Sequence, residues 1–124
     1  MRRTAAETAK QSLMDDLKER AERMAPEVCG LDRQLVWGDG PLTANIVIVG
    51  EAPGEREEIM GKPFVGRAGN LLNKELRNAG LLREDIWATN VVKCRPVKET
   101  DGRLVNRAPT TKEVQSWLGL LMEE

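Results

Sequence analysis

The sequence predicts an α/β fold in which parallel strands alternate with helices. Two runs rich in β-branched and apolar residues, 45–49 and 86–92, have the composition of buried strands. A helical pattern over 70–79 lies between them, so that strand, helix and strand form one right-handed crossover unit. A chain of 124 residues suffices for one small domain. We therefore expect a single domain over residues 1–124.

The amino-terminal part predicts a helix and a short strand. Thr4 and Glu7 form a capping box, and apolar residues follow at helical spacing until Pro26, where we expect the helix to end. The run 34–37 has the character of a short edge strand, and the turn 38–41 closes it.

The carboxyl-terminal part predicts a polar loop over 97–108 and a last helix. Thr110 and Glu113 form a second capping box, and an apolar face follows it. Two parallel strands and one edge strand make a thin sheet, although parallel sheets normally have both faces covered. We therefore expect a shortened domain, a fragment, or a protein that completes its sheet by self-association.

Composition narrows the class of protein. No apolar run is long enough to cross a membrane and no signal segment is recognisable, so we expect a cytoplasmic protein without membrane contact. Two cysteines without a secretory signal argue against a disulfide framework. Histidine, the commonest general base and metal ligand, does not occur. Acid–base chemistry therefore falls on carboxylates.

Charge is distributed unevenly along the chain. The net charge is −1, yet residues 61–107 carry ten basic and five acidic side chains. This excess is either an ordinary solvated surface or a face that contacts phosphates. The helix expected after Gly69 adds a positive dipole end, which favours anionic ligands.

A loop rich in glycine, proline and acids follows the first strand, over residues 50–69. Glycine lets backbone approach a ligand closely, and proline stiffens the segment between. Ligand sites in α/β proteins lie at the carboxyl ends of parallel strands, where this loop begins. Taken one by one, its residues have ordinary interpretations as loop carboxylates, a core aromatic and a turn former: Glu51, Glu57, Phe64 and Asn90.

The loop and the second strand together carry a specific motif. It consists of Gly-Glu-Ala-Pro-Gly at 50–54, Gly-Lys-Pro-Phe-Val-Gly-Arg-Ala-Gly at 61–69 and Thr-Asn-Val-Val-Lys-Cys-Arg-Pro at 89–96, with Asn-Arg-Ala-Pro at 106–109. In these residues the chain resembles the family 4, iron–sulfur type, uracil-DNA glycosylases, over residues 36–113. The resemblance implies a three-layer parallel sheet of the uracil-DNA glycosylase type, here without its carboxyl-terminal half. It also implies base excision repair, in which uracil is flipped out of DNA and its N-glycosidic bond is hydrolysed.

The resemblance implies roles for individual residues. Glu51 matches the acid that activates water or steadies an oxocarbenium-like sugar, and Glu57 matches the acid at the pocket wall opposite uracil C5. Phe64 matches the aromatic that stacks on the base, and Asn90 the amide that reads its edge. The resemblance also implies that the backbone of Gly50 and Ala52 contacts the base. Contacts to uracil-containing DNA are implied for four basic side chains, those of Lys62, Arg67, Lys93 and Arg95.

Two departures from the family pattern bear on its chemistry. The family's [4Fe–4S] cluster takes four cysteines. In this chain Cys94 is at the third position and Cys29 is the candidate for the second. Pro26 stands three residues earlier, where the first cysteine of a Cys-x-x-Cys pair would be, and Trp117 is at the fourth position. We expect no cluster, although two chains together would supply four cysteines. The family's carboxyl-terminal His-Pro motif has no counterpart in this sequence.

Two other functions stay open at this point. One is a non-catalytic module that binds nucleic acid or a nucleobase and keeps the pocket without the chemistry. The other is a small-molecule or nucleotide-binding α/β domain that uses its glycine-rich loop on phosphates. The latter is less favoured, because Gly-Glu-Ala-Pro-Gly is neither a Walker A loop nor a Gly-x-Gly-x-x-Gly fingerprint.

Overall fold

The structure is a computed structural model that describes residues 4–124. Its longest element, α1 (Ala5–Cys29), begins after Thr4, whose hydroxyl accepts a hydrogen bond from Glu7 N at 3.0 Å. The predicted start is therefore confirmed. The predicted end at Pro26 is wrong, because α1 continues to Cys29. Pro26 lies in the last turn, where its missing N–H removes one intrahelical hydrogen bond close to a helix end.

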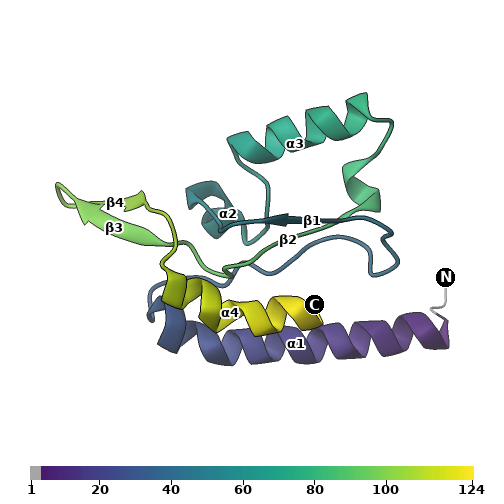
Figure 1. The fold of residues 1–124 in the computed structure, drawn as a ribbon, viewed down its shortest axis with the longest axis horizontal. Helices are drawn as coiled ribbons and strands as arrows, with labels where there is room; N and C mark the ends of the chain where they lie inside the picture. Colours follow the sequence, from purple (N-terminus) through teal and green to yellow (C-terminus); the bar gives the residue numbers. More distant parts are fainter. Residues whose placement is uncertain (1–3) are drawn as a thin grey trace.

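The second half of α1 packs against the last helix, α4 (Thr111–Glu123). Leu17, Ala21 and Ala25 are buried at intervals of four residues, which puts them on one face of α1. Figure 1 shows the two helices side by side, with the amino-terminal half of α1 extending beyond α4. The capping box predicted at the start of α4 is present.

Two parallel strands, β1 (Val47–Gly50) and β2 (Trp87–Asn90), lie next to this helix pair. They are connected through α2 (Glu55–Met60), α3 (Arg67–Asn78) and the short 3-10 turn η1 (Arg83–Asp85). Figure 1 shows α3 on one side of the strands and α1 with α4 on the other. The predicted parallel strand–helix–strand unit is confirmed. Within residues 4–124, however, this sheet has two strands rather than the wider sheet that the family resemblance implied.

The predicted edge strand over 34–37 is reduced to isolated contacts with the segment around β2. Leu35 pairs with Cys94, and Asp39 pairs with Ala88, in two antiparallel bridges. Trp37 lies between these bridges and is buried. This segment covers the edge of β2 that faces away from β1.

The segment 97–108 forms a hairpin, so the prediction of a polar loop is wrong. Its strands are β3 (Val97–Thr100) and β4 (Arg103–Asn106), which pair in an antiparallel register. Asp101 and Gly102 between them have φ of 52° and 75°. Two successive positive φ angles are the geometry of a two-residue type I′ turn, which Asp-Gly favours.

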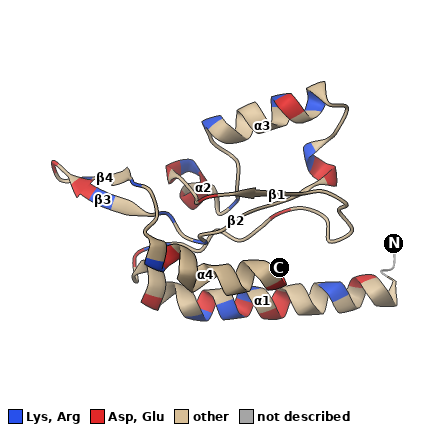
Figure 2. Ribbon diagram, in the orientation of Figure 1, with Lys and Arg blue, Asp and Glu red and all other residues tan. Residues whose placement is uncertain are grey.

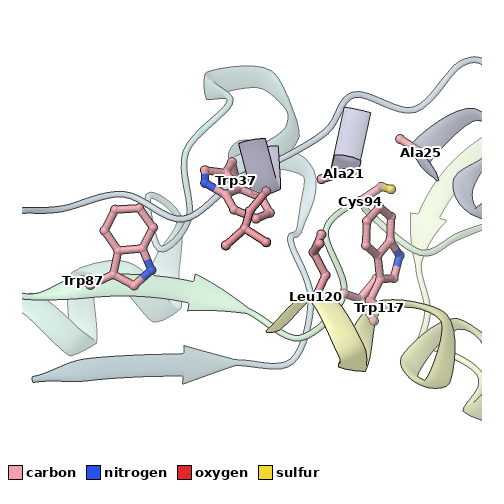
Figure 3. Close-up of a cluster of buried hydrophobic side chains, with 9 residues drawn as sticks. Ala21, Ala25, Trp37, Trp87, Cys94, Trp117 and Leu120 are labelled. Carbon is pink, nitrogen blue, oxygen red and sulfur yellow. The ribbon is translucent and has the colours of Figure 1, made fainter. Parts of the chain in front are cut away.

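Three tryptophans form the centre of the core between the helix pair and the strands (Figure 3). Trp37 and Trp87 are nearly buried, and Trp117 of α4 has no exposed surface. Cys29 and Cys94 form a disulfide, with their Cα atoms 6.2 Å apart. This bond joins the end of α1 to the segment after β2, so the expectation that the two cysteines form no disulfide is wrong.

Acidic and basic residues are mixed along α1, whereas α4 carries its charged residues near its two ends (Figure 2). None of the helices in the part of the chain that the structure describes is long and apolar enough to cross a membrane.

Candidate functional site

A pocket of about 200 Å³ opens where β1 and β2 end. The parallel register places Gly50 opposite Asn90, the last residue of each strand. All six residues that the resemblance assigns to catalysis or base binding line this one pocket, together with residues from the start of α3. The lining residues are Gly50, Glu51, Ala52, Glu57, Phe64, Gly66, Arg67, Ala68 and Asn90.

Gly50 is the point at which an aromatic ring and an amide converge. A Cβ atom at this position would lie 2.7 Å from Phe64 Cζ and would also overlap Asn90 Oδ1. Glycine therefore leaves the room in which both side chains approach the end of β1. The aromatic ring of Phe64 and the amide of Asn90 therefore both border the pocket at the end of β1.

Phe64 adopts a left-handed backbone conformation, with φ of 55°. Such a conformation is strained for a bulky residue, and residues of this kind cluster at ligand sites. Gly69 in the first turn of α3 permits it, because a Cβ atom there would overlap the carbonyl group of Phe64. Pro63, fully buried, anchors the preceding position. The neighbouring residues therefore dictate where the ring lies.

Glu57 holds the loop together through its carboxylate. One oxygen accepts a hydrogen bond from Gly54 N at 2.9 Å, and the other accepts from Val65 N at 3.0 Å and Gly66 N at 2.6 Å. It thereby closes the first turn of α2 (Glu55–Met60) and fixes the backbone that leads into α3. Sequence reasoning missed both α2 and this holding role. The available signal was the capping-box spacing of Glu57 three residues after Gly54.

Glu51 is the exposed carboxylate of the pocket. It follows the last residue of β1, and its main-chain carbonyl accepts a hydrogen bond from Val92 N at 3.0 Å. The backbone of Glu51 is thus tied to the segment after β2, while its side chain reaches solvent beside the cavity. A carboxylate in this position can accept a proton from water or face a developing positive charge.

Two of the basic residues predicted to contact DNA, Lys62 and Arg67, are exposed. Lys62 lies in the loop between α2 and α3, and Arg67 is the first residue of α3 and lines the pocket. The amino terminus of this 12-residue helix also points its positive dipole end toward the pocket. An anion beside the pocket would therefore meet positive charge from two sources.

Lys93 is buried, so the prediction that it contacts DNA is wrong. Its side chain has 0% exposure. Nζ donates hydrogen bonds to Thr89 Oγ1, to the main-chain oxygen of Asn90 and to Glu124 Oε1. Burial lowers the pKa of Lys93, and the charge of Glu124 opposes that shift. Its ammonium group faces the interior rather than a ligand surface.

Arg95 is also buried, and the same prediction is wrong for it. Nε donates to Asn106 Oδ1 at 2.6 Å, and Nη1 lies 3.8 Å from Glu58 Oε1. Glu58 is bound more closely by Arg33, at 2.9 Å. Arg95 therefore connects β4 with α2 and stabilises the fold around the pocket.

Comparison with known proteins assigns the family. The chain matches the family described as the Uracil DNA glycosylase superfamily over residues 37–124, which include the whole pocket. It belongs to the uracil-DNA glycosylase superfamily. The type-4 uracil-DNA glycosylase of Thermotoga maritima is 45% identical over 84% of this chain and 51% of its own length. Those of Archaeoglobus fulgidus and Pyrobaculum aerophilum are 46% and 42% identical over 76% and 74% of this chain.

The chain spans about half the length of these type-4 uracil-DNA glycosylases. The matched share is 51% of the Thermotoga maritima protein, 45% of the Archaeoglobus fulgidus protein and 43% of the Pyrobaculum aerophilum protein. Membership of the superfamily therefore rests on the half that contains the pocket. What the whole relatives do is a separate question for this chain.

The residues present do not fit the iron–sulfur cluster that the family resemblance implied. A [4Fe–4S] cluster needs four thiolate-type ligands. Here Cys29 and Cys94 are bonded to each other, Pro26 lies within α1, and the buried indole of Trp117 belongs to the core cluster that contains Cys94. Within residues 4–124, no three His, Cys, Asp or Glu side chains gather to hold a metal ion. In this superfamily member a disulfide and indole packing hold α1 against the segment after β2.

Proposed function

We propose that the pocket binds a uracil flipped out of DNA and that the chain is a uracil-DNA glycosylase-like protein of base excision repair. Its reaction would be hydrolysis of the N-glycosidic bond of uracil in DNA. The observation that carries the proposal is the convergence of Glu51, Phe64 and Asn90 on one cavity at the ends of two parallel strands. Superfamily membership over residues 37–124 supports it.

Recognition of the base follows from the chemistry of the lining. The ring of Phe64 offers an apolar face for stacking on a planar pyrimidine. The amide of Asn90 offers one acceptor and two donor hydrogens, which complement the N3–H and C4 carbonyl of uracil. Gly50 and Ala52 let main chain approach the base closely. Cytosine presents the opposite donor and acceptor pattern at these atoms and would be rejected.

Bond cleavage would depend on Glu51. As the glycosidic bond breaks, the deoxyribose gains positive character, which a nearby carboxylate stabilises. The exposed carboxylate can also orient the water that attacks the sugar. Glu57 contributes by forming the wall of the pocket and by holding the loop that carries Phe64.

Contacts with the DNA backbone would come from Lys62 and Arg67. Both side chains are exposed, and Arg67 lines the pocket at the amino terminus of α3. A nucleotide can reach the cavity only after leaving the base stack, so the phosphates beside it must be held in place. Positive charge next to the pocket supplies that contact.

A cytoplasmic location is part of the same proposal.

A non-catalytic uracil-binding module is the second candidate. It is favoured by the pocket lining, in which more residues are suited to base binding than to bond cleavage. The pocket supplies residues for base binding, but its chemistry rests on Glu51, because the carboxylate of the wall acid Glu57 is already bound by main-chain N–H groups. Binding without cleavage would be the result.

The proposal also includes how the two-stranded sheet is covered and extended. The described part of β1 pairs with β2 on one edge, and Ile46, Val47 and Val49 are exposed. Parallel strands are normally covered on both faces. We therefore include self-association, in which a second copy covers β1 and extends the two strands into a wider three-layer sheet.

One experiment separates the two candidates. The purified chain is incubated with a labelled single-stranded oligonucleotide that carries one uracil, and the abasic product is cleaved with alkali. We expect a product band from the wild-type chain and at least about a 100-fold slower reaction for Glu51→Ala, the scale expected when a catalytic acid or base is removed. Glu55→Ala is the matched control, because Glu55 is an exposed acid at the start of α2 that does not line the pocket.

Binding measured in parallel decides the remaining cases. Preferential binding of the uracil oligonucleotide over its thymine counterpart without any product supports the module. If the chain neither cleaves the uracil strand nor prefers it, the proposal is wrong in both forms.

A further inference from the structure

Lys93 is a buried ammonium group that the proposed chemistry does not use. Its side chain has 0% exposure, and it stands three residues after Asn90, just beyond the end of β2. A buried lysine is costly unless its charge and its hydrogen-bond donors are satisfied. The groups around Lys93 must therefore satisfy both its charge and its hydrogen-bond donors.

Each proton of the ammonium group has its own acceptor. Nζ donates to Thr89 Oγ1 at 2.8 Å, to the main-chain oxygen of Asn90 at 2.5 Å and to Glu124 Oε1 at 2.5 Å. An ammonium group has three donors, so this set is complete. The ring of Trp37, with its centroid 5.0 Å from Nζ, covers the ammonium group in a cation–π contact.

The bond to Asn90 fills a gap in the pairing of β2. Along the edge away from β1, Ala88 exchanges two main-chain hydrogen bonds with Asp39, each at 2.9 Å. Further along, Val36 N donates to the main-chain oxygen of Lys93 at 2.7 Å. Between these two points, the main-chain oxygen of Asn90 takes its hydrogen bond from Lys93 Nζ rather than from a neighbouring strand. A buried carbonyl needs such a partner.

Glu124 completes the arrangement from the end of α4. Its side chain is 1% exposed, and its second oxygen accepts a hydrogen bond from Trp87 Nε1 at 3.1 Å. Gly38 leaves the space for it, because a Cβ atom there would lie 2.5 Å from Glu124 Oε2. Residues from two segments, 37–38 and β2, thus surround the charge pair of Lys93 and Glu124.

We infer that Lys93 is a positioning residue for uracil recognition, which fixes the main chain of Asn90 so that its amide faces the pocket. The inference rests on the proposed function. Lys93 Nζ donates a hydrogen bond to the main-chain oxygen of Asn90. The side-chain Oδ1 of Asn90 lies next to Gly50. An amide that reads two atoms of a base must be held in one orientation, which neighbouring hydrogen bonds supply. Glu124 neutralises the charge that this clamp brings into the interior.

Two variants isolate the clamp. Glu124→Gln removes the negative charge but leaves Lys93 in place, with an acceptor oxygen still available. The double variant Lys93→Met, Glu124→Gln removes the clamp without leaving an unpaired buried charge. Affinity is measured for a single-stranded oligonucleotide with one uracil and for the same strand with a tetrahydrofuran abasic analogue. Circular dichroism melting verifies that each variant is folded at the assay temperature.

We expect the double variant to bind the uracil strand about 10-fold more weakly than the wild-type chain, while its affinity for the abasic strand is unchanged. Glu124→Gln should stay within about 3-fold of the wild-type chain on both strands. A merely structural role would weaken binding of both strands equally, and that result would overturn the inference. So would a double variant that keeps its full preference for uracil.

A second measurement uses the wild-type chain and does not depend on the folding of a variant. The ¹⁵N resonance of Lys93 Nζ is followed while either strand is added. We expect a shift with the uracil strand and none with the abasic strand, and equal responses would overturn the inference. If the wild-type chain does not distinguish uracil from thymine, the proposed function fails regardless of how Lys93 behaves.

Discussion

Gly50 offers the sharpest test of the pocket at the level of a single residue. In Gly50→Ala the new methyl group would meet Phe64 Cζ at 2.7 Å and would overlap Asn90 Oδ1. Both side chains would have to move away from the end of β1. We expect at least about a 10-fold loss of affinity for the uracil strand, because stacking and amide contacts are each worth about 1–3 kcal/mol. The measurement is fluorescence anisotropy with uracil and abasic strands.

Gly119 supplies the control for this substitution. It lies in the exposed part of α4, and a Cβ atom there would meet nothing within 4 Å. Gly119→Ala should leave binding unchanged and raise the free energy of unfolding by about 0.5–1 kcal/mol, since alanine is the better helix former. Equal losses of affinity in the two variants would contradict the proposed convergence at Gly50.

Single residues also separate what sequence can predict from what it cannot. The position of Asn90 follows from a general rule, because the carboxyl ends of parallel strands meet at one edge of a sheet. The burial of Lys93 depends on Glu124, which is 31 residues further along the chain. The burial of Arg95 likewise depends on Asn106. Basic residues after a strand look alike in sequence whether they face DNA or a distant carboxylate.

At the level of elements, the start of α4 carries a pH dependence. Arg107 donates to Glu113 at 2.7 Å and 3.0 Å, and Glu113 accepts a further bond from Thr110 N. The hydrogen bond from Arg107 is the main reason that the pKa of Glu113 falls from 4.5 to about 2. Because the folded-state pKa lies below the unfolded value, ionised Glu113 stabilises the fold above pH 4.5. This contribution is lost as the pH falls from 4.5 toward about 2.

Glu113→Gln measures this contribution. Glutamine keeps the capping box but loses the ion pair. Since Glu113 and Arg107 are partly exposed, we expect the variant to be less stable by about 1 kcal/mol at neutral pH, after allowing for solvent screening. The deficit should disappear in urea unfolding at strongly acidic pH. Glu99→Gln in the exposed β3 serves as control, and a deficit that is the same at both pH values would contradict this account.

The elements that sequence analysis missed share a physical reason. α2 has six residues and begins at Gly54, which has no capping side chain of its own. The hairpin over 97–106 has an Asp-Gly turn, but its strands are largely polar and lack the apolar alternation that marks a strand. Pro26 is accommodated because α1 ends three residues later at Cys29, which is bonded to Cys94. In each case the local signal is short, and it lacks the apolar periodicity on which the other predictions rested.

At the scale of the whole molecule, the location of the pocket was predictable and its surroundings were not. The strand–helix–strand pattern predicted a site at the ends of the two strands, and the family resemblance selected Glu51, Phe64 and Asn90 as its residues. The charge excess over 61–107 did not say which side chains face outward. Within that excess, Lys62 and Arg67 are exposed, whereas Lys93 and Arg95 are buried and stabilise the fold. This division changes what should be expected of DNA binding.

The salt dependence of binding tests that division. Each phosphate neutralised on a single strand contributes a slope of about −0.7 to the plot of log affinity against log salt. Lys62→Ala and Arg67→Ala should each make the slope shallower by about 0.7, because both side chains are exposed near the pocket. The slope should not change in the double variant at Lys93 and Glu124, whose ammonium group has no exposed surface. Lys18→Ala on the exposed side of α1 is the matched control. A wild-type affinity that does not vary with salt would count against DNA as the ligand. A slope that changes only in the Lys93 variant would mean that Lys93, and not Lys62 or Arg67, contacts the phosphates.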